Sequence, residues 1–183
     1  FMISVHYFKD NVQIPPNIAC IGCFDGVHRG HQELINKTVK LAKEKNLKPM
    51  VITFDPDPVE IFGDGHMLLT TLNERIELFE RFGIEEVLII HFDEKVMNKS
   101  PLEFKEEILD KLNIDTLICG FDFTYGYKGQ GNIDTLKKDG VNLIVIPEYC
   151  YYGKKISSSR IRKELEKKNY NFVNKLLGYE YKK

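Results

Sequence analysis

The sequence predicts an α/β fold, with a doubly wound parallel sheet in a single domain. Short, nearly continuous apolar runs of strand length alternate along the chain with stretches whose apolar residues recur at helical spacing. Such apolar strands are typical of a parallel sheet that helices cover on both faces. The unusual polar clusters follow directly after apolar runs, where ligands bind in these folds. No repeat, low-complexity segment or linker divides the chain.

The individual elements are predicted from apolar runs, amphipathic stretches and capping signals. Strands are expected at residues 18–24, 50–54, 87–92, 117–119 and 143–146, and helices at residues 32–45, 71–83, 133–138, 157–168 and 171–177, with one more helix starting at residue 100. Thr71 and Glu74 form a capping-box pattern, and Gly83 closes that helix. Pro101 takes the first position of its helix, where its missing N–H costs nothing. Gly178 ends the last helix.

The composition is that of an ordinary soluble globular protein. The chain has 183 residues, of which 43% are hydrophobic and 29% charged, with a formal net charge of −1. This charge does not support a nucleic-acid partner, and the apolar runs are far shorter than the roughly 20 residues of a membrane span. No charged-then-apolar leader is visible, and the four cysteines lie mostly in apolar segments, as buried thiols of a reducing compartment do. We therefore expect a cytoplasmic protein without a membrane, nucleic-acid or obligate protein partner.

The segment IGCFDGVHRGH at residues 21–31 joins the first predicted strand to the first predicted helix. Three interpretations of this segment are open. It is a metal or redox site, a loop in which the histidines are simply packed, or a site where the imidazoles face an anion. Cys20 and Cys23 point to opposite faces of an extended segment unless Gly22 breaks it. The spacing of the cysteines and histidines is tighter than in a zinc finger, and a redox Cys-x-x-Cys normally opens a helix. These points disfavour a metal or redox site.

A phosphate site fits this position best. Gly26 and Gly30 permit a tight turn and a close backbone approach where strand passes into helix. The helix N-terminus is expected to offer unpaired N–H groups and the positive end of its dipole. His28 and His31 would add two donors there, exposed to a ligand rather than packed. The chain has no Gly-x4-Gly-Lys-Ser/Thr loop, which excludes a P-loop mechanism.

The H-x-G-H pattern after a first strand resembles the signature of the nucleotidylyltransferase superfamily. The longer string GCFDGVHRGHQ resembles, more narrowly, the adenylyltransferase domain of the prokaryotic bifunctional riboflavin kinase/FAD synthetase family. Other segments agree in the same order: VITFDPDP at 51–58, LLTTLNERIELFERFGI at 68–84, GFDFTYG at 120–126, ISSSRIR at 156–162 and KLLGYEY at 175–181. The resemblance covers nearly the whole chain. It implies a Rossmann-like fold over residues 2–181, and a riboflavin kinase domain is expected to be absent.

The resemblance implies transfer of AMP from ATP to FMN, giving FAD and pyrophosphate, with Mg²⁺ whose ligands are unknown. In this family the histidine pair contacts ATP phosphates, and a Ser-Ser-Thr-x-x-Arg segment closes over them. It implies the catalytic residues His28, His31 and Arg162, the ATP-binding residues Gly22, Phe24, Gly26, Gly30, Asp122, Ser157, Ser158 and Ser159, and the flavin-binding residues Asp55 and Asp57. Because the FMN phosphate is already an anionic nucleophile, the reaction needs positioning and charge neutralisation rather than a protein nucleophile.

The chain departs from the family pattern at several positions. Asp57 stands where a histidine usually lies between two prolines, which removes a donor and adds a negative charge that could recruit Mg²⁺. Ser159 replaces a threonine but keeps the hydroxyl, and Gly129 stands where an arginine often lies. Asp55 is also explained as a turn former, and the serines as caps of the following helix. Residues 62–70 are expected to form a mobile loop beside the flavin site.

Two other functions remain compatible with these residues. One is a nucleotidylyltransferase of the same superfamily that uses another acceptor, such as a pantetheine or nicotinamide nucleotide. The other is a nonenzymatic nucleotide- or flavin-binding relative, which the departures at Asp57 and Gly129 motivate. The match over several ordered segments favours FMN as the acceptor.

Overall fold

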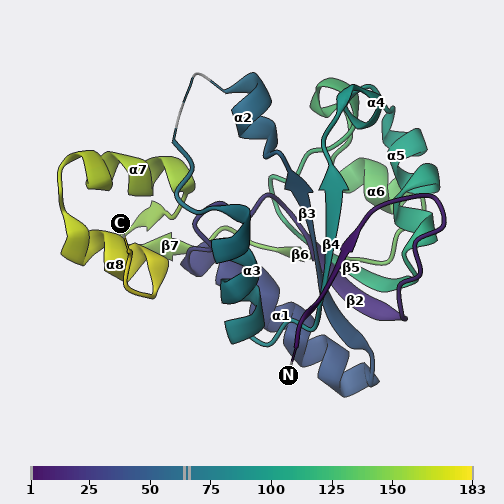
Figure 1. Ribbon diagram of the computed structural model, residues 1–183, viewed down its shortest axis with the longest axis horizontal. Coiled ribbons are helices and arrows are strands. Elements are labelled where there is room, and N and C mark those ends of the chain that lie inside the picture. Colours follow the sequence, from purple (N-terminus) through teal and green to yellow (C-terminus); the bar gives the residue numbers. More distant parts are fainter. Residues whose placement is uncertain (1, 64, 66, 183) are drawn as a thin grey trace.

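The computed structural model describes residues 2–63, 65 and 67–182. Within these residues, six parallel strands form one sheet in the order β1-β4-β3-β2-β5-β6. They are β1 (Ser4–Tyr7), β2 (Asn17–Ile21), β3 (Lys48–Asp55), β4 (Glu86–His91), β5 (Ile114–Gly120) and β6 (Leu143–Ile146). The chain order reverses at β2, with β3 and β4 on one side of it and β5 and β6 on the other (Figure 1). The predicted doubly wound parallel sheet is confirmed.

Helices cover both faces of the sheet (Figure 1). The helices are α1 (Arg29–Lys45), α2 (Pro58–Phe62), α3 (Leu72–Arg81), α4 (Glu94–Met97), α5 (Pro101–Glu107), α6 (Ile133–Lys138), α7 (Ser158–Glu166) and α8 (Tyr170–Leu177), with short 3₁₀ turns at Leu109–Lys111 and Tyr127–Gly129. In β2, Ile18 and Cys20 pack toward α1 and α3, whereas Ala19 and Ile21 pack toward α5 and α6. Because both faces are buried, the strands read as continuous apolar runs.

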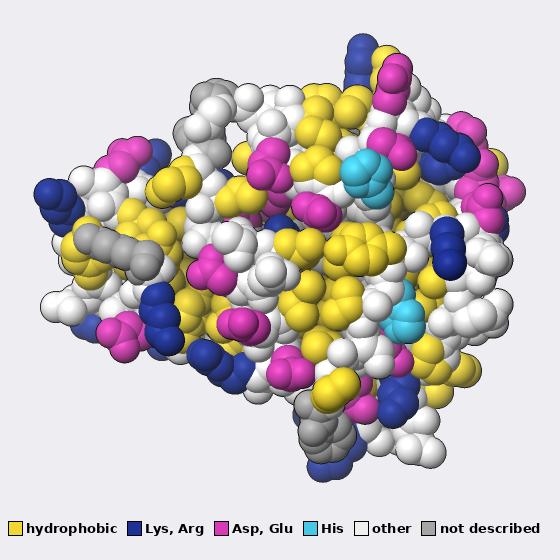
Figure 2. All heavy atoms as spheres, in the orientation of Figure 1, with side chains coloured by type: hydrophobic (Ala, Val, Ile, Leu, Met, Phe, Trp, Pro, Cys, Tyr) yellow, Lys and Arg dark blue, Asp and Glu magenta, His cyan; other side chains and the backbone are white. Residues whose placement is uncertain are grey.

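The surface seen in Figure 2 is the same face of the molecule as in Figure 1. Hydrophobic side chains gather near its centre, over the strands, and most lysines and arginines lie toward its margin. Among the described residues, no helix is long and apolar enough to cross a membrane.

The C-terminal lobe, residues 150–177, lies at one end of the sheet (yellow-green in Figure 1). It consists of an antiparallel hairpin, β7 (Cys150–Tyr151) and β8 (Lys154–Lys155), followed by α7 and α8. Ile161 of α7 and Val173 and Leu176 of α8 form a third core cluster with Leu69. Since Leu69 belongs to the segment before α3, this cluster joins the lobe to the main body.

Several predicted boundaries differ from those of the structure. The strand predicted over 18–24 ends at Ile21, because Phe24 leaves the extended region with a φ of 57°. The helix predicted from residue 32 begins at Arg29. β1, α2, α4 and the hairpin were not predicted, since they are short and largely exposed.

The capping signals were read correctly. Thr71 and Ser100 both cap their helices in complete capping boxes, and Gly178 ends α8 in the left-handed region. Within the loop expected at residues 62–70, Asp64 and His66 lie outside the described residues.

Candidate active site

Two adjoining cavities open at the carboxyl ends of the strands, where the chain order reverses around β2. The smaller, of about 260 Å³, is lined by the segments after β2, β5 and β6 and by the starts of α1 and α7. The larger, of about 750 Å³, lies beside the ends of β3 and β4 and beside α5, and is mainly apolar. Gly22, Cys23, Asp122 and Phe123 line both cavities. Ligands bind at such switch points in doubly wound folds, which makes this the candidate active site.

His28 lines the smaller cavity and caps the N-terminus of α1 with its imidazole. Its Nδ1 accepts hydrogen bonds from the backbone N–H groups of Gly30 and His31, at 3.1 and 3.3 Å. An accepting ring nitrogen carries no proton, so the proton of the neutral imidazole is on Nε2. Burial lowers the pKa of His28 to about 4. The local geometry therefore fixes one tautomer, with Nε2–H as a donor.

This arrangement corrects two expectations from the sequence. The imidazole of His28, expected to be exposed, is only 5% exposed. The N-terminus of α1 was expected to offer unpaired N–H groups, but those of Gly30 and His31 donate to His28 itself. The donors available to a ligand in the smaller cavity are therefore the imidazoles, because these two backbone N–H groups are already paired.

His31 stacks on His28 in the first turn of α1. The ring centroids are 3.6 Å apart with an interplanar angle of 15°, and Phe24 meets His31 edge-on at 5.3 Å. Burial, reinforced by the neighbouring His28, holds the pKa of His31 well below its ordinary value. Within the described residues, the buried Nδ1 of His31 has no hydrogen-bond partner. Two neutral imidazoles thus lie side by side at the cavity wall.

We expect the folding stability to fall as the pH is lowered from about 6.5 toward 4. The unfolded chain binds a proton at His28 near the ordinary imidazole pKa of about 6.5, whereas the folded chain binds it only near a pKa of about 4. Between these values the unfolded state holds more protons, so acid favours unfolding, by up to about 3 kcal/mol. Urea unfolding at about pH 7 and about pH 4.5 measures the effect, and His28→Asn should reduce it. Equal stability at both pH values would contradict a buried neutral imidazole.

The loop between β2 and α1 adopts a conformation that its residues rarely take. Phe24 and Val27 have φ values of 57° and 41°, which is costly for a bulky and for a β-branched side chain. Contacts from distant segments hold the loop: Gly26 N–H donates to the Thr70 hydroxyl at 2.9 Å, and the Tyr179 hydroxyl donates to the Gly26 carbonyl. Because His28 follows directly, the loop conformation determines where both imidazoles lie.

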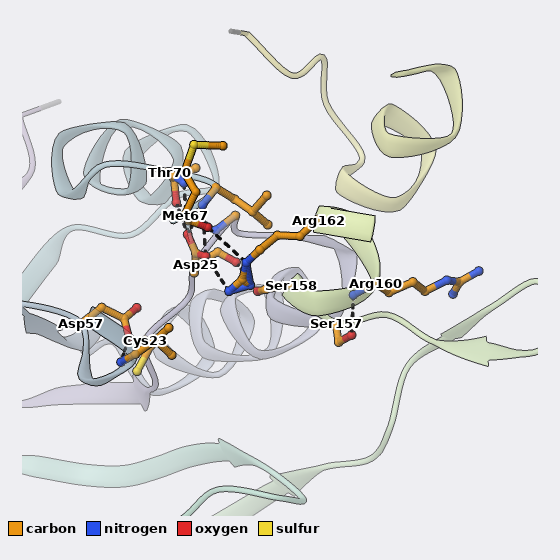
Figure 3. Close-up of polar contacts among 12 residues, drawn as sticks. Cys23, Asp25, Asp57, Met67, Thr70, Ser157, Ser158, Arg160 and Arg162 are labelled. Carbon is orange, nitrogen blue, oxygen red and sulfur yellow. Dashed lines mark hydrogen bonds and ion pairs between the residues drawn. The ribbon is translucent and has the colours of Figure 1, made fainter. Parts of the chain in front are cut away.

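The predicted ATP-binding residues divide into two groups. Those that line the smaller cavity are Gly22, Phe24, Gly30, Asp122, Ser157 and Ser158. Gly26 packs instead against Leu69, and Ser159 is exposed. The hydroxyl of Ser157 accepts Arg160 N–H at 3.1 Å (Figure 3), so the capping interpretation also holds for this residue.

Asp122, after β5, pairs with Lys155 of β8 at the smaller cavity, at 2.8 Å. The Lys155 ammonium also lies over the Phe121 ring, 4.9 Å from its centroid. Both charged side chains are partly exposed, so the pair adds little to stability. The pair places a carboxylate and a cation at the same cavity.

Arg162 points from α7 toward Asp25 and does not line either cavity (Figure 3). Its Nε donates to the carbonyl of Met67 at 3.1 Å, and its Nη2 lies 3.5 Å from Oδ2 of Asp25. Ser158, one turn earlier on the same helix, does line the smaller cavity. Arg162 therefore lies next to the site, and its guanidinium is paired with the buried carboxylate of Asp25.

The predicted flavin-binding carboxylates line neither cavity. Asp57 is fully buried and caps α2: its Oδ1 accepts Val59 N–H at 2.9 Å, and Glu60 completes a capping box. Burial raises the pKa of the Asp57 carboxyl group. Asp55 is the last residue of β3, and its carbonyl accepts Phe92 N–H, which continues the ladder between β3 and β4. The larger cavity is instead lined by aromatic side chains, namely Phe54, Phe62, Phe92, Phe104 and Tyr125.

Cys20 and Cys23 lie on opposite faces of the sheet, as predicted. Cys20 belongs to the core on the α1 face, and Cys23 packs against the core on the other face. Burial raises the pKa of both thiols, that of Cys20 to about 12. Across the part of the chain that the structure describes, no group of three or more His, Cys, Asp or Glu side chains could hold a metal ion.

The fold and this site define the class as a doubly wound α/β protein that carries an H-x-G-H segment at the carboxyl end of β2. A solved structure of pantoate–β-alanine ligase from Francisella tularensis shares the fold, with a TM-score of 0.54 at 14% identity over 96% of this chain and 86% of that one. Another, described as a macrolide-efflux protein from Streptococcus pneumoniae, has a TM-score of 0.87 at 28% identity and covers 98% of this chain and 72% of its own.

The family follows from the match of a FAD synthetase family model to residues 11–160. The chain belongs to the FAD synthetase family, as the sequence motifs predict. It is 34% identical to the bifunctional riboflavin kinase/FMN adenylyltransferase of Bacillus subtilis, over 90% of this chain and 54% of that protein. The corresponding protein of Buchnera aphidicola subsp. Schizaphis graminum is 39% identical over 86% and 53%. The chain thus spans about half the length of these relatives. A putative enzyme of the same description from Geobacillus thermodenitrificans is 32% identical over 97% of this chain and 98% of its own length.

Proposed function

We propose that residues 2–181 transfer the AMP group of ATP to FMN, forming FAD and pyrophosphate. The observation that carries this proposal is the pair of cavities with Gly22, Cys23, Asp122 and Phe123 as common walls. The smaller cavity offers imidazole, hydroxyl and ammonium groups for phosphates, and the larger offers aromatic surfaces for a flat ring. With ATP phosphates in the first and the flavin ring in the second, the FMN phosphate would reach the α-phosphorus at the shared walls.

The residues of the smaller cavity suit the chemistry of this step. An oxygen of the FMN phosphate attacks the α-phosphorus of ATP; the new O–P bond forms while the bond to pyrophosphate breaks, and pyrophosphate leaves with the electron pair. The attacking oxygen is already anionic, so no residue has to remove a proton. His28 donates through Nε2–H, His31 lies beside it, and Lys155 supplies a positive charge. Such preorganised donors stabilise the charge that develops on the phosphates.

The carboxylates of the smaller cavity fit Mg²⁺ that is bound by the nucleotide. Mg²⁺ in such sites takes one or two carboxylates together with substrate phosphates, and keeps several waters. Asp122 and Glu148 both line this cavity and would hold the ion beside the phosphates. When bound there, Mg²⁺ would neutralise part of the phosphate charge. This donor set agrees with an ion that arrives with ATP.

Incubation with FMN, ATP and Mg²⁺, followed by chromatography, tests the proposal directly. We expect FAD and pyrophosphate in equal amounts, and parallel reactions with oxidised and reduced FMN identify the preferred form. Product from 4′-phosphopantetheine or nicotinamide mononucleotide, with none from FMN, would assign the chain to another acceptor. ATP binding without pyrophosphate release for any acceptor would support a nonenzymatic nucleotide-binding protein instead.

A further inference from the structure

Asp25 stands at the centre of a buried contact network that the reaction described above does not use. Its side chain is buried, and its two carboxylate oxygens share the N–H of Leu69 as a donor. Oδ1 accepts hydrogen bonds from Leu69 N–H at 2.9 Å, from Thr70 N–H at 3.1 Å and from the Thr70 hydroxyl at 3.2 Å. Oδ2 lies 3.1 Å from the Leu69 nitrogen and 3.5 Å from Nη2 of Arg162. Both oxygens therefore hold the segment before α3, and Oδ2 also faces Arg162.

The guanidinium of Arg162 is held in one orientation by this network (Figure 3). Its Nε donates to the Met67 carbonyl while its Nη2 faces Asp25. Among the described residues, its buried Nη1 has no hydrogen-bond partner. A buried guanidinium N–H without an acceptor is costly. This nitrogen is thus a donor without a partner in the described part of the chain, on the helix whose Ser158 lines the smaller cavity.

Ser158 connects the same network to the cavity wall. It lines the smaller cavity, and its hydroxyl donates to the backbone carbonyl of Asp25 at 2.8 Å. Arg162 follows Ser158 by four positions on α7, so both side chains lie on one face of that helix. Asp25 therefore contacts α7 twice, through its carbonyl and through its carboxylate.

We propose that Asp25 is a positioning residue of the phosphate site, whose Oδ2 orients Arg162 so that Nη1 meets a phosphate oxygen of ATP. This inference rests on the proposed function, and it adds a residue that contacts no substrate itself. An arginine that is oriented before the nucleotide arrives loses little side-chain entropy on binding. Without the carboxylate, the same guanidinium would be free to take other rotamers, and its phosphate contact would weaken.

Asp25→Asn tests the proposal with little change in shape. The amide oxygen can keep the three donors of Oδ1, whereas the amide NH₂ takes the place of Oδ2 and carries no negative charge to pair with Arg162. We expect the Kd of ATP, measured by calorimetry with Mg²⁺ and no FMN, to rise about 10-fold. Arg162→Ala should have a similar effect, and the double variant should bind no more weakly than Arg162→Ala. An unchanged Kd in Asp25→Asn, or effects that multiply in the double variant, would overturn the proposal.

Arg162→Lys separates positioning from a merely structural ion pair. Lysine keeps a charge opposite Asp25 but lacks the rigid fork that carries Nη1. ATP affinity should therefore fall as far as in Arg162→Ala, while the midpoint of thermal unfolding stays near that of the wild type. Wild-type ATP affinity in Arg162→Lys would overturn the proposal, even if Asp25→Asn failed to fold.

Asp115→Asn is the matched control, because it removes an ion pair with Lys45 at the opposite end of β5. It should leave ATP affinity unchanged. Since calorimetry needs no acceptor, a wild-type protein that binds ATP but forms no FAD would refute the proposed function and leave this coupling measurable.

Discussion

His28→Asn is expected to lower turnover by about 10²- to 10³-fold and to leave the folding stability close to that of the wild type. The asparagine oxygen can accept the N–H groups at the start of α1 that now bond to Nδ1, because asparagine is a strong N-cap. It places no donor where Nε2–H lies, and loss of one such donor has an effect of this order. Initial rates of FAD formation and urea unfolding measure the two quantities.

His28→Ala is the matched variant, because it removes the cap as well as the donor. Turnover should fall as far as in His28→Asn, and the free energy of unfolding should also fall by about 1 kcal/mol. The sequence alone predicts that His28→Ala and His31→Ala lower turnover far more than folding stability. The structure adds that His28 caps α1 and His31 does not, so the loss of a cap is expected only in His28→Ala. Wild-type turnover in His28→Asn would mean that the imidazole is only a cap.

Gly30→Ala is expected to lower turnover about 100-fold, although alanine is the better helix former. A Cβ at this position would lie 2.9 Å from Cε1 and 3.1 Å from Nδ1 of His28, so the imidazole has to shift. The ring is buried and stacked on His31, so both rings move together. A displacement of about 1 Å in a positioning group costs on the order of 100-fold in rate. Steady-state kinetics with FMN and ATP measures the loss.

Asn36→Ala, on the exposed face of α1, is the control for helix propensity. It raises the propensity without contact to His28, so turnover should not change. In Gly30→Ala the gain in propensity, about 1 kcal/mol, offsets part of the steric cost, and stability should change little. Wild-type turnover in Gly30→Ala would show that the imidazole position is not critical.

The parts of the fold with local signals were predictable from the sequence. Strands buried on both faces are apolar throughout, and the capping boxes at Thr71 and Ser100 depend on residues three positions apart. β1 is an exposed edge strand with mixed side chains, so its sequence carries little signal. The cap of α2 was also predictable from the sequence, because Asp57 and Glu60 have capping-box spacing.

The site was predictable only where its residues are close in sequence. The H-x-G-H segment indicates a phosphate site at a strand end, but histidine is not a usual N-cap, so the capping role of His28 was not foreseen. Asp25 meets Thr70 across a separation of 45 residues, and Gly26 meets Tyr179 across 153. No periodicity or spacing rule connects residues so far apart. Their roles became visible only once the chain was folded.

The attachment of α8 to the H-x-G-H loop has a consequence for protein engineering. The side chains of Arg29 and Gln32 donate to the carbonyls of Lys175 and Leu177, and the Tyr179 hydroxyl donates to the Gly26 carbonyl. A deletion that stopped at the end of the sheet would keep the Rossmann-like layers but remove the outer support of a strained loop. A fusion partner joined after Tyr181 would leave every one of these contacts in place. A shortened variant that is to keep the site therefore has to keep residues 175–179, although they lie far from the H-x-G-H segment in sequence.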